Sequence, residues 1–352
     1  MMPFGNPAHE LVGQVVNGNW RVIEKLVRPE DATGGNFSVG YIIENIEGKK
    51  AFLKALDFSA ALKAPDPARV FQALTEAFNF ERDILVACRE KHMSRVVTAL
   101  DEGRIELPGG TYPVQFLIFD LAEGDIRSHT KTARAFDLAW TLRALHHVCV
   151  GLWQLHAHGI AHQDLKPSNV LVFKDDQMKV ADLGRADRQG IACPFSSLSI
   201  AGAKPYAPLE LLYGELQTDW RCRRFGCDLY LLGSMAVFFF SGIQMTATIK
   251  TKLNPSHVWN VWPHDYRQVL PYVRDAFERA VEEIITSIPL EIRDELQRAI
   301  RQLCEPDPLL RGHPLNKRGF SNPYSLERYV TLFDILGKRA ELNLLSRARL
   351  GY

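Results

Sequence analysis

The segment Gly159–Asp187 constrains the fold of this chain more than any other, because short apolar runs and polar loops alternate in it. A long apolar stretch ends at its start, and a short loop then carries a carboxylate, an ammonium and an amide within six residues. Two short apolar runs follow, Val170–Phe173 and Met178–Ala181, on either side of a turn at Asp175–Asp176. This pattern predicts a helix, a polar loop and a β-hairpin in succession.

The hairpin predicts that distant polar side chains meet. Asn169 precedes its first strand and Asp182 follows its second, so both are expected at one end, close to Asp164. Carboxylate and amide oxygens suit hard cations, and the ammonium of Lys166 suits a phosphate. Polar capping groups in surface loops are the alternative explanation. That alternative accounts for one such cluster, but hardly for two at hairpin-matched spacing.

Composition and charge narrow the class of protein. Hydrophobic residues make up 46% of the 352 and charged residues 24%, which excludes a disordered, collagen-like or coiled-coil chain. The 42 Lys and Arg residues balance 41 Asp and Glu, for a net charge of +1. The chain therefore has no general excess of positive charge for nucleic acid or an anionic membrane.

Three features favour a cytoplasmic location. The N-terminal residues 1–13 lack a cationic start and an apolar run, so they do not resemble a signal peptide. The apolar stretch Leu229–Ile243 is 15 residues long, short of the ~20 needed to span a membrane, so we expect a buried core helix. The six cysteines form no C-x-x-C pair, which favours free thiols in a reducing compartment.

Hydrophobic periodicity predicts an α+β chain with a small strand-rich part followed by a larger helical part. The expected strands of the first part are Trp20–Val27, Val39–Asn45, Lys50–Leu56, Val96–Glu106 and Tyr112–Asp120, with one helix at Val70–Arg89. The expected helices of the second part are Leu138–Ala157, Asp228–Phe240, Asp275–Ser287, Glu291–Cys304 and Ser325–Leu345.

The loop and the end of the hairpin resemble two motifs of the eukaryotic-like Ser/Thr protein kinase family. His162–Asn169 is similar to the catalytic loop H-R-D-L-x-x-x-N, and Asp182-Leu183-Gly184 is similar to D-F-G. The spacing within and between the two motifs also fits. The resemblance covers about Trp20–Arg311 and implies a bilobal protein-kinase-like fold, with a β-rich N-lobe and a larger helical C-lobe.

The resemblance implies transfer of the γ-phosphoryl group of ATP to a protein Ser/Thr hydroxyl with Mg²⁺. Asp164 is expected to orient the substrate hydroxyl and accept its proton, and Lys166 to steady the transferred group. Asn169 and Asp182 are expected to bind the magnesium ions. The implied partners are a nucleotide and a protein substrate, with no nucleic acid and no membrane.

The strand-rich part is expected to bind the nucleotide. Lys54 matches the lysine of the family's V-A-I-K, and its carboxylate partner is expected to be Glu81, which lies beside the apolar face of the following helix. Glu76 is the alternative partner. The residues expected to cover the phosphates, in an incomplete match to the glycine-rich loop, are Thr33, Gly34, Gly35, Asn36, Phe37 and Ser38.

The resemblance also places the adenosine. Backbone groups of Asp120 and Ala122 are expected to bind the adenine edge, and Phe119 to close the back pocket. Asp125 is expected to reach the ribose, although charge beside a turn is commonly only solvated. Leu171 is expected to lie under the adenine.

Four departures from the family pattern carry predictions. Phe52 replaces a small Ala and Gly40 replaces a Val, so we expect a volume exchange in which the Phe52 ring fills the space left at Gly40. Gln163 replaces the arginine that receives an activation-loop phosphate, which predicts activity without that modification despite Ser196, Ser197 and Ser199. Ala203 replaces a threonine that helps to align the catalytic groups, which puts turnover in question.

Architectural roles follow from the same resemblance. Glu210 is expected to form a buried ion pair with Arg311, and Asp228 to bond the catalytic-loop backbone. The expected parts of the chain are an N-terminal extension (1–19), the N-lobe (20–121), the C-lobe (122–335) with an insertion near 246–289, and a basic tail (336–352). Trp259 and Trp262 in the insertion either anchor it or form a docking surface.

Two other functions stay open at this point. A pseudokinase scaffold that binds partners without chemistry is favoured by the damaged glycine loop, Phe52 and Ala203. A small-molecule kinase of the aminoglycoside or choline type shares the H-x-D, Asn and Asp core. The Pro208-Leu209-Glu210 and Asp228 features argue against the second, because they shape a platform for protein substrates.

Overall fold

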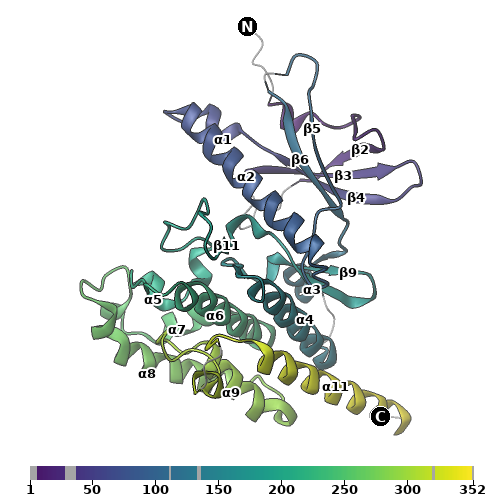
Figure 1. Cartoon of the computed structure of the whole chain (residues 1–352). Coiled ribbons are helices and arrows are strands. Elements are labelled where there is room, and N and C mark those ends of the chain that lie inside the picture. Colours follow the sequence, from purple (N-terminus) through teal and green to yellow (C-terminus); the bar gives the residue numbers. More distant parts are fainter. Residues whose placement is uncertain (1–5, 28–36, 111, 133–135, 319–321, 351–352) are drawn as a thin grey trace. The chain divides into compact units, whose positions relative to one another are not determined.

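The computed structural model describes residues 6–27, 37–110, 112–132, 136–318 and 322–350 of the chain (Figure 1). It divides into two compact units. Unit 1 comprises the chain up to Met93 together with Val97–Glu123, and unit 2 comprises Ser94–Val96 and Gly124–Tyr352. The expected division into a strand-rich part and a larger helical part is confirmed.

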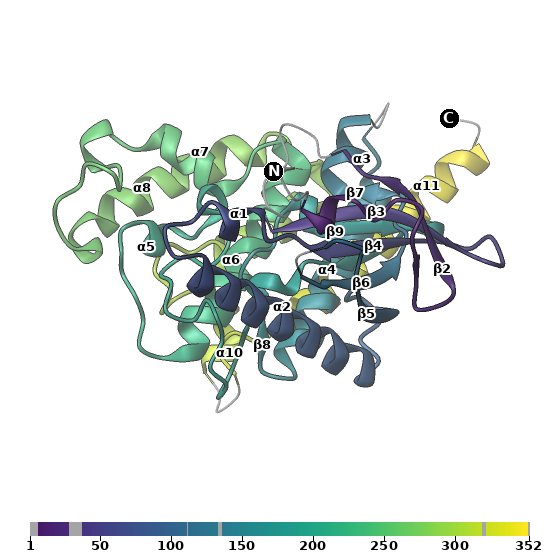
Figure 2. The ribbon, with the colours of Figure 1, turned by 90° about the horizontal axis from the view of Figure 1, so that it is seen from above.

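Unit 1 is built on one antiparallel sheet with the strand order β1-β2-β3-β4-β6-β5. Its strands are β1 (Val15–Val16), β2 (Trp20–Lys25), β3 (Ser38–Asn45), β4 (Lys50–Leu56), β5 (Asp101–Ile105) and β6 (Val114–Asp120). Helix α1 (Ser59–Leu62) precedes the long helix α2 (Pro67–Glu90), which lies beside the sheet (Figure 2). Buried residues alternate with more exposed ones along β3 and most of β4, because successive side chains of a strand point to opposite faces of the sheet.

Two expectations for unit 1 are corrected. The strand expected at Val96–Glu106 begins only at Asp101, because Val96 belongs to unit 2, where it forms a parallel bridge to Val180. Residues 6–19 do not form a separate extension. Ala8 and Leu11 are buried in the core of unit 1, and β1 pairs with β2, so this segment covers part of the sheet.

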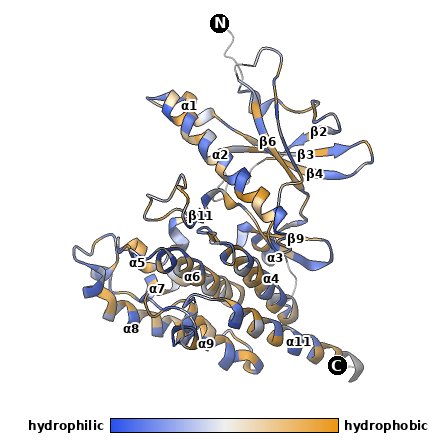
Figure 3. Cartoon of the chain, in the orientation of Figure 1, coloured by the Kyte–Doolittle hydropathy of each residue, from blue (hydrophilic) through white to orange (hydrophobic). Residues whose placement is uncertain are grey.

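Unit 2 is mostly helical and carries short two- and three-stranded sheets. Its helices are α3 (Ile126–Thr132), α4 (Leu138–His156), α5 (Leu209–Leu212), α6 (Trp220–Ser241), α7 (Met245–Lys252), α8 (Tyr266–Ile285), α9 (Arg293–Leu303), α10 (Pro314–Lys317) and α11 (Glu327–Leu350). Its strands are β7 (Gly124–Asp125), β8 (Ile160–Ala161), β9 (Val170–Phe173), β10 (Gln177–Val180) and β11 (Asp187–Arg188). Figure 3 shows apolar and polar residues alternating along α8, α9 and α11, as in helices that bury one face.

Helix α6 forms the centre of the core of unit 2. Asp219 caps its start, where the side chain accepts a hydrogen bond from the Cys222 amide, and Gly242, with φ 75°, caps its end. Gly233 allows α9 to approach closely, since any side chain there would collide with the Cys304 sulfur. The apolar stretch Leu229–Ile243 lies largely in this buried helix, as expected. Within the described residues no single helix has the length and apolar composition of a membrane span, and α6 and α7 meet that criterion only as a pair bent by 79°.

The expected insertion and much of the expected tail contribute to the core of unit 2. Residues 246–289 form α7 and α8, whose apolar faces are buried, and Trp259 and Trp262 pack partly buried against the same core. The tryptophans therefore anchor this region. Residues 336–350 continue α11, and Leu336 and Ala340 are buried in the core that includes α4. The expected separate tail is wrong up to Ala340, because α11 continues an amphipathic pattern without a break.

Candidate active site

The β9–β10 hairpin determines where the polar loop of unit 2 lies. Val170 faces Val180 in its register, and the Ala181 amide donates to the Asn169 carbonyl over 2.8 Å. The next residue, Asp182, therefore follows the strand end beside Asn169, as the sequence predicts. Asp182 adopts a left-handed conformation with φ 63°, which turns the chain into the short helix Leu183–Arg185.

His162 ties the loop to the hairpin. Its Nε2 lies 2.9 Å from the Ala181 carbonyl oxygen, and its Nδ1 accepts a hydrogen bond of 3.2 Å from the Asp164 amide. The first contact requires a proton on Nε2 and the second an unprotonated Nδ1, so one neutral tautomer satisfies both. The imidazole is fully buried. It therefore holds the backbone on both sides of the candidate site.

Asp164 is held through both of its carboxylate oxygens. Lys166 Nζ lies 2.7 Å from Oδ2, and Asn169 Nδ2 donates to the same oxygen over 3.1 Å. The Ala203 amide donates to Oδ1 over 2.7 Å. Asp164 is 6% exposed and Lys166 is 2% exposed, so the ion pair is shielded from water and from screening by salt.

The contact from position 203 is made by the backbone. The Ala203 amide holds Asp164 without a side-chain hydroxyl. This contact needs a close approach at the preceding Gly202, where a side-chain carbon would lie 2.8 Å from Asp164 Oδ1. Glycine is therefore required at that position for the segment to reach the catalytic loop.

Asp228 of α6 supports the loop from behind. Its Oδ2 accepts from the His162 amide over 2.7 Å, and its Oδ1 accepts from the Gln163 amide over 2.8 Å. His156 Nε2 lies 2.8 Å from Oδ2. The predicted contact of Asp228 with the loop backbone is confirmed, and His156 is a partner that the sequence reasoning missed.

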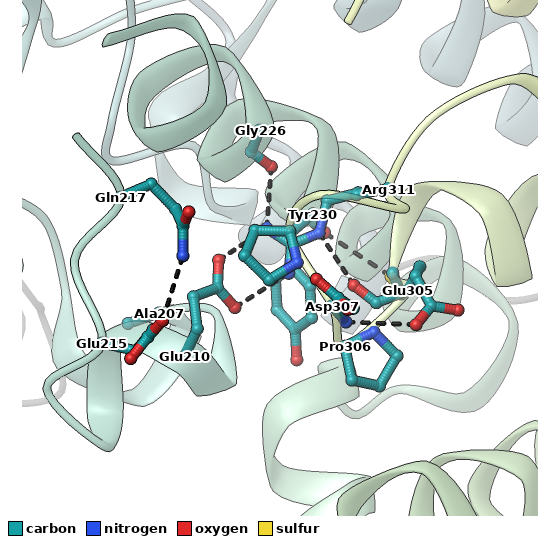
Figure 4. Close-up of polar contacts among 12 residues, drawn as sticks. Ala207, Glu210, Glu215, Gln217, Gly226, Tyr230, Glu305, Pro306, Asp307 and Arg311 are labelled. Atoms are coloured by element: carbon teal, nitrogen blue, oxygen red, sulfur yellow. Dashed lines mark hydrogen bonds and ion pairs between the residues drawn. The ribbon is translucent and has the colours of Figure 1, made fainter. Parts of the chain in front are cut away.

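Glu210 and Arg311 form the expected buried ion pair (Figure 4). The two guanidinium branches lie 2.7 and 2.8 Å from the two carboxylate oxygens, and Arg311 also donates to the Gly226 and Glu305 carbonyls. Its guanidinium lies 5.1 Å from the ring centre of Tyr230. Burial alone would lower the pKa of Arg311, but the charge of Glu210 outweighs it and raises the pKa above its usual value.

In unit 1 the candidate lysine pairs with the helix. Lys54 Nζ on β4 lies 2.7 and 3.0 Å from the two carboxylate oxygens of Glu81 on α2. Glu81 is buried because it falls on the same face as Leu85 and Cys88. Glu76, the alternative, accepts a hydrogen bond from Gln72 on the exposed side of the helix instead.

Phe52 occupies the space beside Gly40. Gly40 faces Lys54 on β4 and Ile42 faces Phe52, so the four side-chain positions share one face of the sheet. A side-chain carbon at Gly40 would lie 2.8 Å from Phe52 Cε2, closer than two carbons pack. The expected exchange of volume is therefore present within the sheet.

A double-mutant cycle tests this exchange. Gly40→Val is expected to destabilise the chain by ~1–3 kcal/mol through overpacking, and Phe52→Ala by ~1–3 kcal/mol through the loss of a partly buried ring. The double variant is expected to cost at least ~1 kcal/mol less than the sum, because each change relieves the other. Urea unfolding of the four proteins measures the coupling. Additive costs would contradict the exchange.

The remaining nucleotide-binding predictions have mixed outcomes. Thr33, Gly34, Gly35 and Asn36 lie outside the described residues, while Phe37 is partly exposed and Ser38 begins β3. At the end of β6, Phe119 is buried with its ring centre 6.3 Å from that of Phe52, Asp120 pairs with Lys49, and Ala122 is half-buried two residues beyond.

The predictions that fall in unit 2 concern β7 and β9. Asp125 and Leu171 face each other in the register of these strands. The Asp125 carboxylate accepts a 2.7 Å hydrogen bond from the Ser128 amide, so it caps α3. This capping role is a local structural one, and the ribose contact stays a prediction.

Asp187 and Arg224 are polar residues that the sequence reasoning missed. They form an ion pair of 2.9 Å beside Gln163, and both are buried. The sequence offers only a group of arginines, Arg221, Arg223 and Arg224, shortly before the expected apolar helix. The partner of Arg224 lies 37 positions earlier, and no periodicity connects the two.

The donor set fits a metal that arrives with phosphate. Asn169 gives its amide nitrogen to Asp164, which leaves its oxygen as the ligand atom, and Asp182 follows at the strand end. Among the described residues no three His, Cys, Asp or Glu side chains gather as a metal cluster. An amide and a carboxylate suit Mg²⁺, which usually takes its other ligands from water and phosphates.

Comparisons with known proteins bear on the family of this chain. The sequence model of the protein kinase domain matches residues 39–313. Over 65% of its length the chain is 24% identical to the probable serine/threonine-protein kinase pknA2 of Bifidobacterium longum, and over 36% it is 27% identical to an Aurora kinase of Debaryomyces hansenii. Over 81% it is 22% identical to the hormonally up-regulated neu tumor-associated kinase of Mus musculus. The alignments cover 27%, 30% and 34% of these relatives, so the chain spans about a third of their length or less.

Proposed function

This chain belongs to the protein kinase family, and on that basis we propose that it is a serine/threonine kinase that transfers the γ-phosphoryl group of ATP to a protein hydroxyl with Mg²⁺. The observation that carries the proposal is the buried Asp164, whose two oxygens are held by Lys166, Asn169 and the Ala203 amide. A carboxylate fixed in this way is suited to orient a hydroxyl.

Asp164 would receive the proton of the substrate hydroxyl. The substrate oxygen forms a bond to the γ-phosphorus while the bond from that phosphorus to the β-phosphate oxygen breaks, which releases ADP. Lys166 lies 2.7 Å from Asp164, so its ammonium would neutralise charge on the transferred group close to the attacking oxygen. A lysine at this position favours serine and threonine over tyrosine as acceptors.

Lys54 would bind phosphate oxygens of the nucleotide. Glu81 holds its ammonium at 2.7 Å and so restricts where the charge can lie. Asn169 and Asp182 would hold Mg²⁺, which neutralises the phosphate charge when bound. Most of the rate enhancement would come from positioning and charge neutralisation.

Two further proposals concern the substrate class and the cellular location. We propose a protein substrate because Glu210 and Asp228 form the buried supports expected of a protein-substrate platform. We propose a cytoplasmic location, which the free thiols of Cys149, Cys193, Cys222, Cys227 and Cys304 support.

A transfer assay tests the function. Labelled ATP and Mg²⁺ are expected to label the chain itself or a generic protein, and to leave choline and aminoglycosides unlabelled. Lys54→Met is expected to abolish labelling, and the matched control Lys50→Met, an exposed lysine on the same strand, to retain it. Nucleotide binding without any phosphate transfer would instead identify a pseudokinase. Labelling of choline or of an aminoglycoside would identify a small-molecule kinase.

A further inference from the structure

The carboxylate of Asp187 is buried and fully engaged. It lies on β11, which pairs with β8 directly before the catalytic loop, and it is 4% exposed. Oδ1 accepts a hydrogen bond of 3.0 Å from Trp220 Nε1. Oδ2 accepts one of 3.0 Å from the Ser196 hydroxyl and lies 2.9 Å from Arg224 Nη2. Asp187 therefore joins the activation segment, which we define as residues 182–210, to the start of α6.

Arg224 extends this connection to the catalytic loop. Its side chain is 3% exposed. Nη2 donates to the Ser196 carbonyl over 2.8 Å, and Nη1 donates to Gln163 Oε1 over 3.2 Å. Gln163 Nε2 donates in turn to the Arg224 carbonyl over 2.8 Å and to Asp228 Oδ1 over 3.1 Å. A continuous network, buried except at the partly exposed Ser196, thus runs from the middle of the activation segment to the base of the catalytic loop.

The charges in this network favour a neutral side chain at position 163. An arginine there would bring a second guanidinium against Arg224, with Asp187 already paired to the first. The Asp228 carboxylate nearby is already bound by the His162 and Gln163 amides and lies 2.8 Å from His156 Nε2. Two like charges at hydrogen-bonding distance in a buried site repel strongly. A neutral amide avoids this repulsion and offers Arg224 an acceptor. Gln163 and Arg224 therefore depend on each other.

The network does what a phosphate does in other switches. A phosphorylated residue orders a segment by supplying a negative charge for an arginine. Here Asp187 supplies that charge permanently, and the arginine comes from α6. The segment held at Ser196 continues to Ala203, whose amide donates to Asp164 over 2.7 Å.

We propose that Asp187 and Arg224 are positioning residues that hold the activation segment in its working conformation without phosphorylation. They touch no reacting group and act on Asp164 through the segment and through Gln163. The kinetic consequence rests on the proposed kinase activity. The ordering of the segment does not, so the two can fail separately.

Hydrogen exchange of the whole chain tests the ordering directly. After phosphatase treatment, with loss of phosphate checked by mass, residues 188–203 are expected to be protected in the wild type. Arg224→Gln and Asp187→Asn are expected to exchange at least ~10-fold faster in that segment. The matched control Arg221→Gln, an exposed arginine on the same helix, is expected to exchange like the wild type. Protection of the wild type only when Ser196, Ser197 or Ser199 carries phosphate would overturn the proposal.

Arg224→Lys provides a second test of the ordering, which still applies if Arg224→Gln does not fold. Lysine keeps a positive charge facing Asp187. It lacks the two-branched guanidinium that reaches both Gln163 and Ser196. With an unchanged thermal midpoint, exchange of residues 188–203 is expected to lie between the wild type and Arg224→Gln, or above the wild type if Arg224→Gln does not fold. Exchange equal to that of the wild type would overturn the proposal.

Steady-state kinetics adds the functional consequence. Phosphatase treatment is expected to leave kcat of the wild type unchanged. Arg224→Gln is expected to lower kcat at least ~10-fold with KM for ATP unchanged, because Arg224 acts on Asp164 and not on groups that bind the nucleotide. Partial recovery of kcat in Arg224→Lys supports positioning, and a loss of activity on phosphatase treatment would refute it. If the wild type transfers no phosphate, the proposed function fails and the exchange result still decides the ordering.

Discussion

Asp164→Asn is expected to lower kcat by ~10²–10⁴-fold while the chain stays folded. Asparagine has the same shape, so its oxygen can still accept the Ala203 amide that now reaches Asp164 over 2.7 Å. It cannot take a proton from a substrate hydroxyl, and it leaves Lys166 without its charged partner. Steady-state phosphate transfer measures the loss, and the thermal midpoint checks the fold.

A second acidic residue, in the hairpin that follows the loop of Asp164, serves as the control for Asp164→Asn. Asp175→Asn, at the exposed turn of the hairpin, is expected to keep kcat within a factor of ~2, because asparagine tolerates the left-handed φ of 59° found there. Equal kcat values for Asp164→Asn and the wild type would refute the assignment of Asp164. Equal losses in both variants would point to damage of the hairpin.

Arg311→Met is expected to lower the free energy of unfolding by ~3–5 kcal/mol. The side chain of Arg311 is 0% exposed and that of Glu210 is 4% exposed, so removing the guanidinium leaves a buried carboxylate without a partner. The Gly226 and Glu305 carbonyls lose their donor at the same time. Urea unfolding measures the change.

Two controls separate a buried unpaired charge from the loss of an ion pair as such. Arg339→Met breaks a partly exposed pair with Glu295, and is expected to cost less than ~1 kcal/mol. The double replacement Glu210→Leu with Arg311→Met is expected to recover much of the loss, since it leaves no buried charge behind. Similar costs for Arg311→Met and Arg339→Met would show that burial of this pair carries little energy.

The sequence predicted the ion pairs Lys54–Glu81 and Glu210–Arg311 on different grounds. Glu81 could be preferred to Glu76 because helical spacing puts it beside Leu85 and Cys88, and the structure places it against Lys54. The pairing of Glu210 with Arg311 came only from resemblance to a family. Their positions are 101 residues apart, and no local pattern links them.

Errors in the expected boundaries also have a physical cause. Residues 6–19 and 336–350 look peripheral because each is short and partly polar, yet Leu11 and Leu336 are both buried. A short apolar segment finds its place only against a surface formed by other elements. Burial at the ends of the chain is therefore poorly indicated by local pattern.

The amino-acid sequence by itself determined the local geometry of the candidate site. Alternating apolar residues and a turn at Asp175–Asp176 bring Asn169 and Asp182 together, because pairing within a hairpin depends only on neighbours in the chain. Tertiary structure alone decided which groups from distant positions hold Asp164 and Gln163. The Ala203 amide reaches Asp164 across 39 positions and Arg224 meets Gln163 across 61, and such contacts depend on how elements distant in sequence pack.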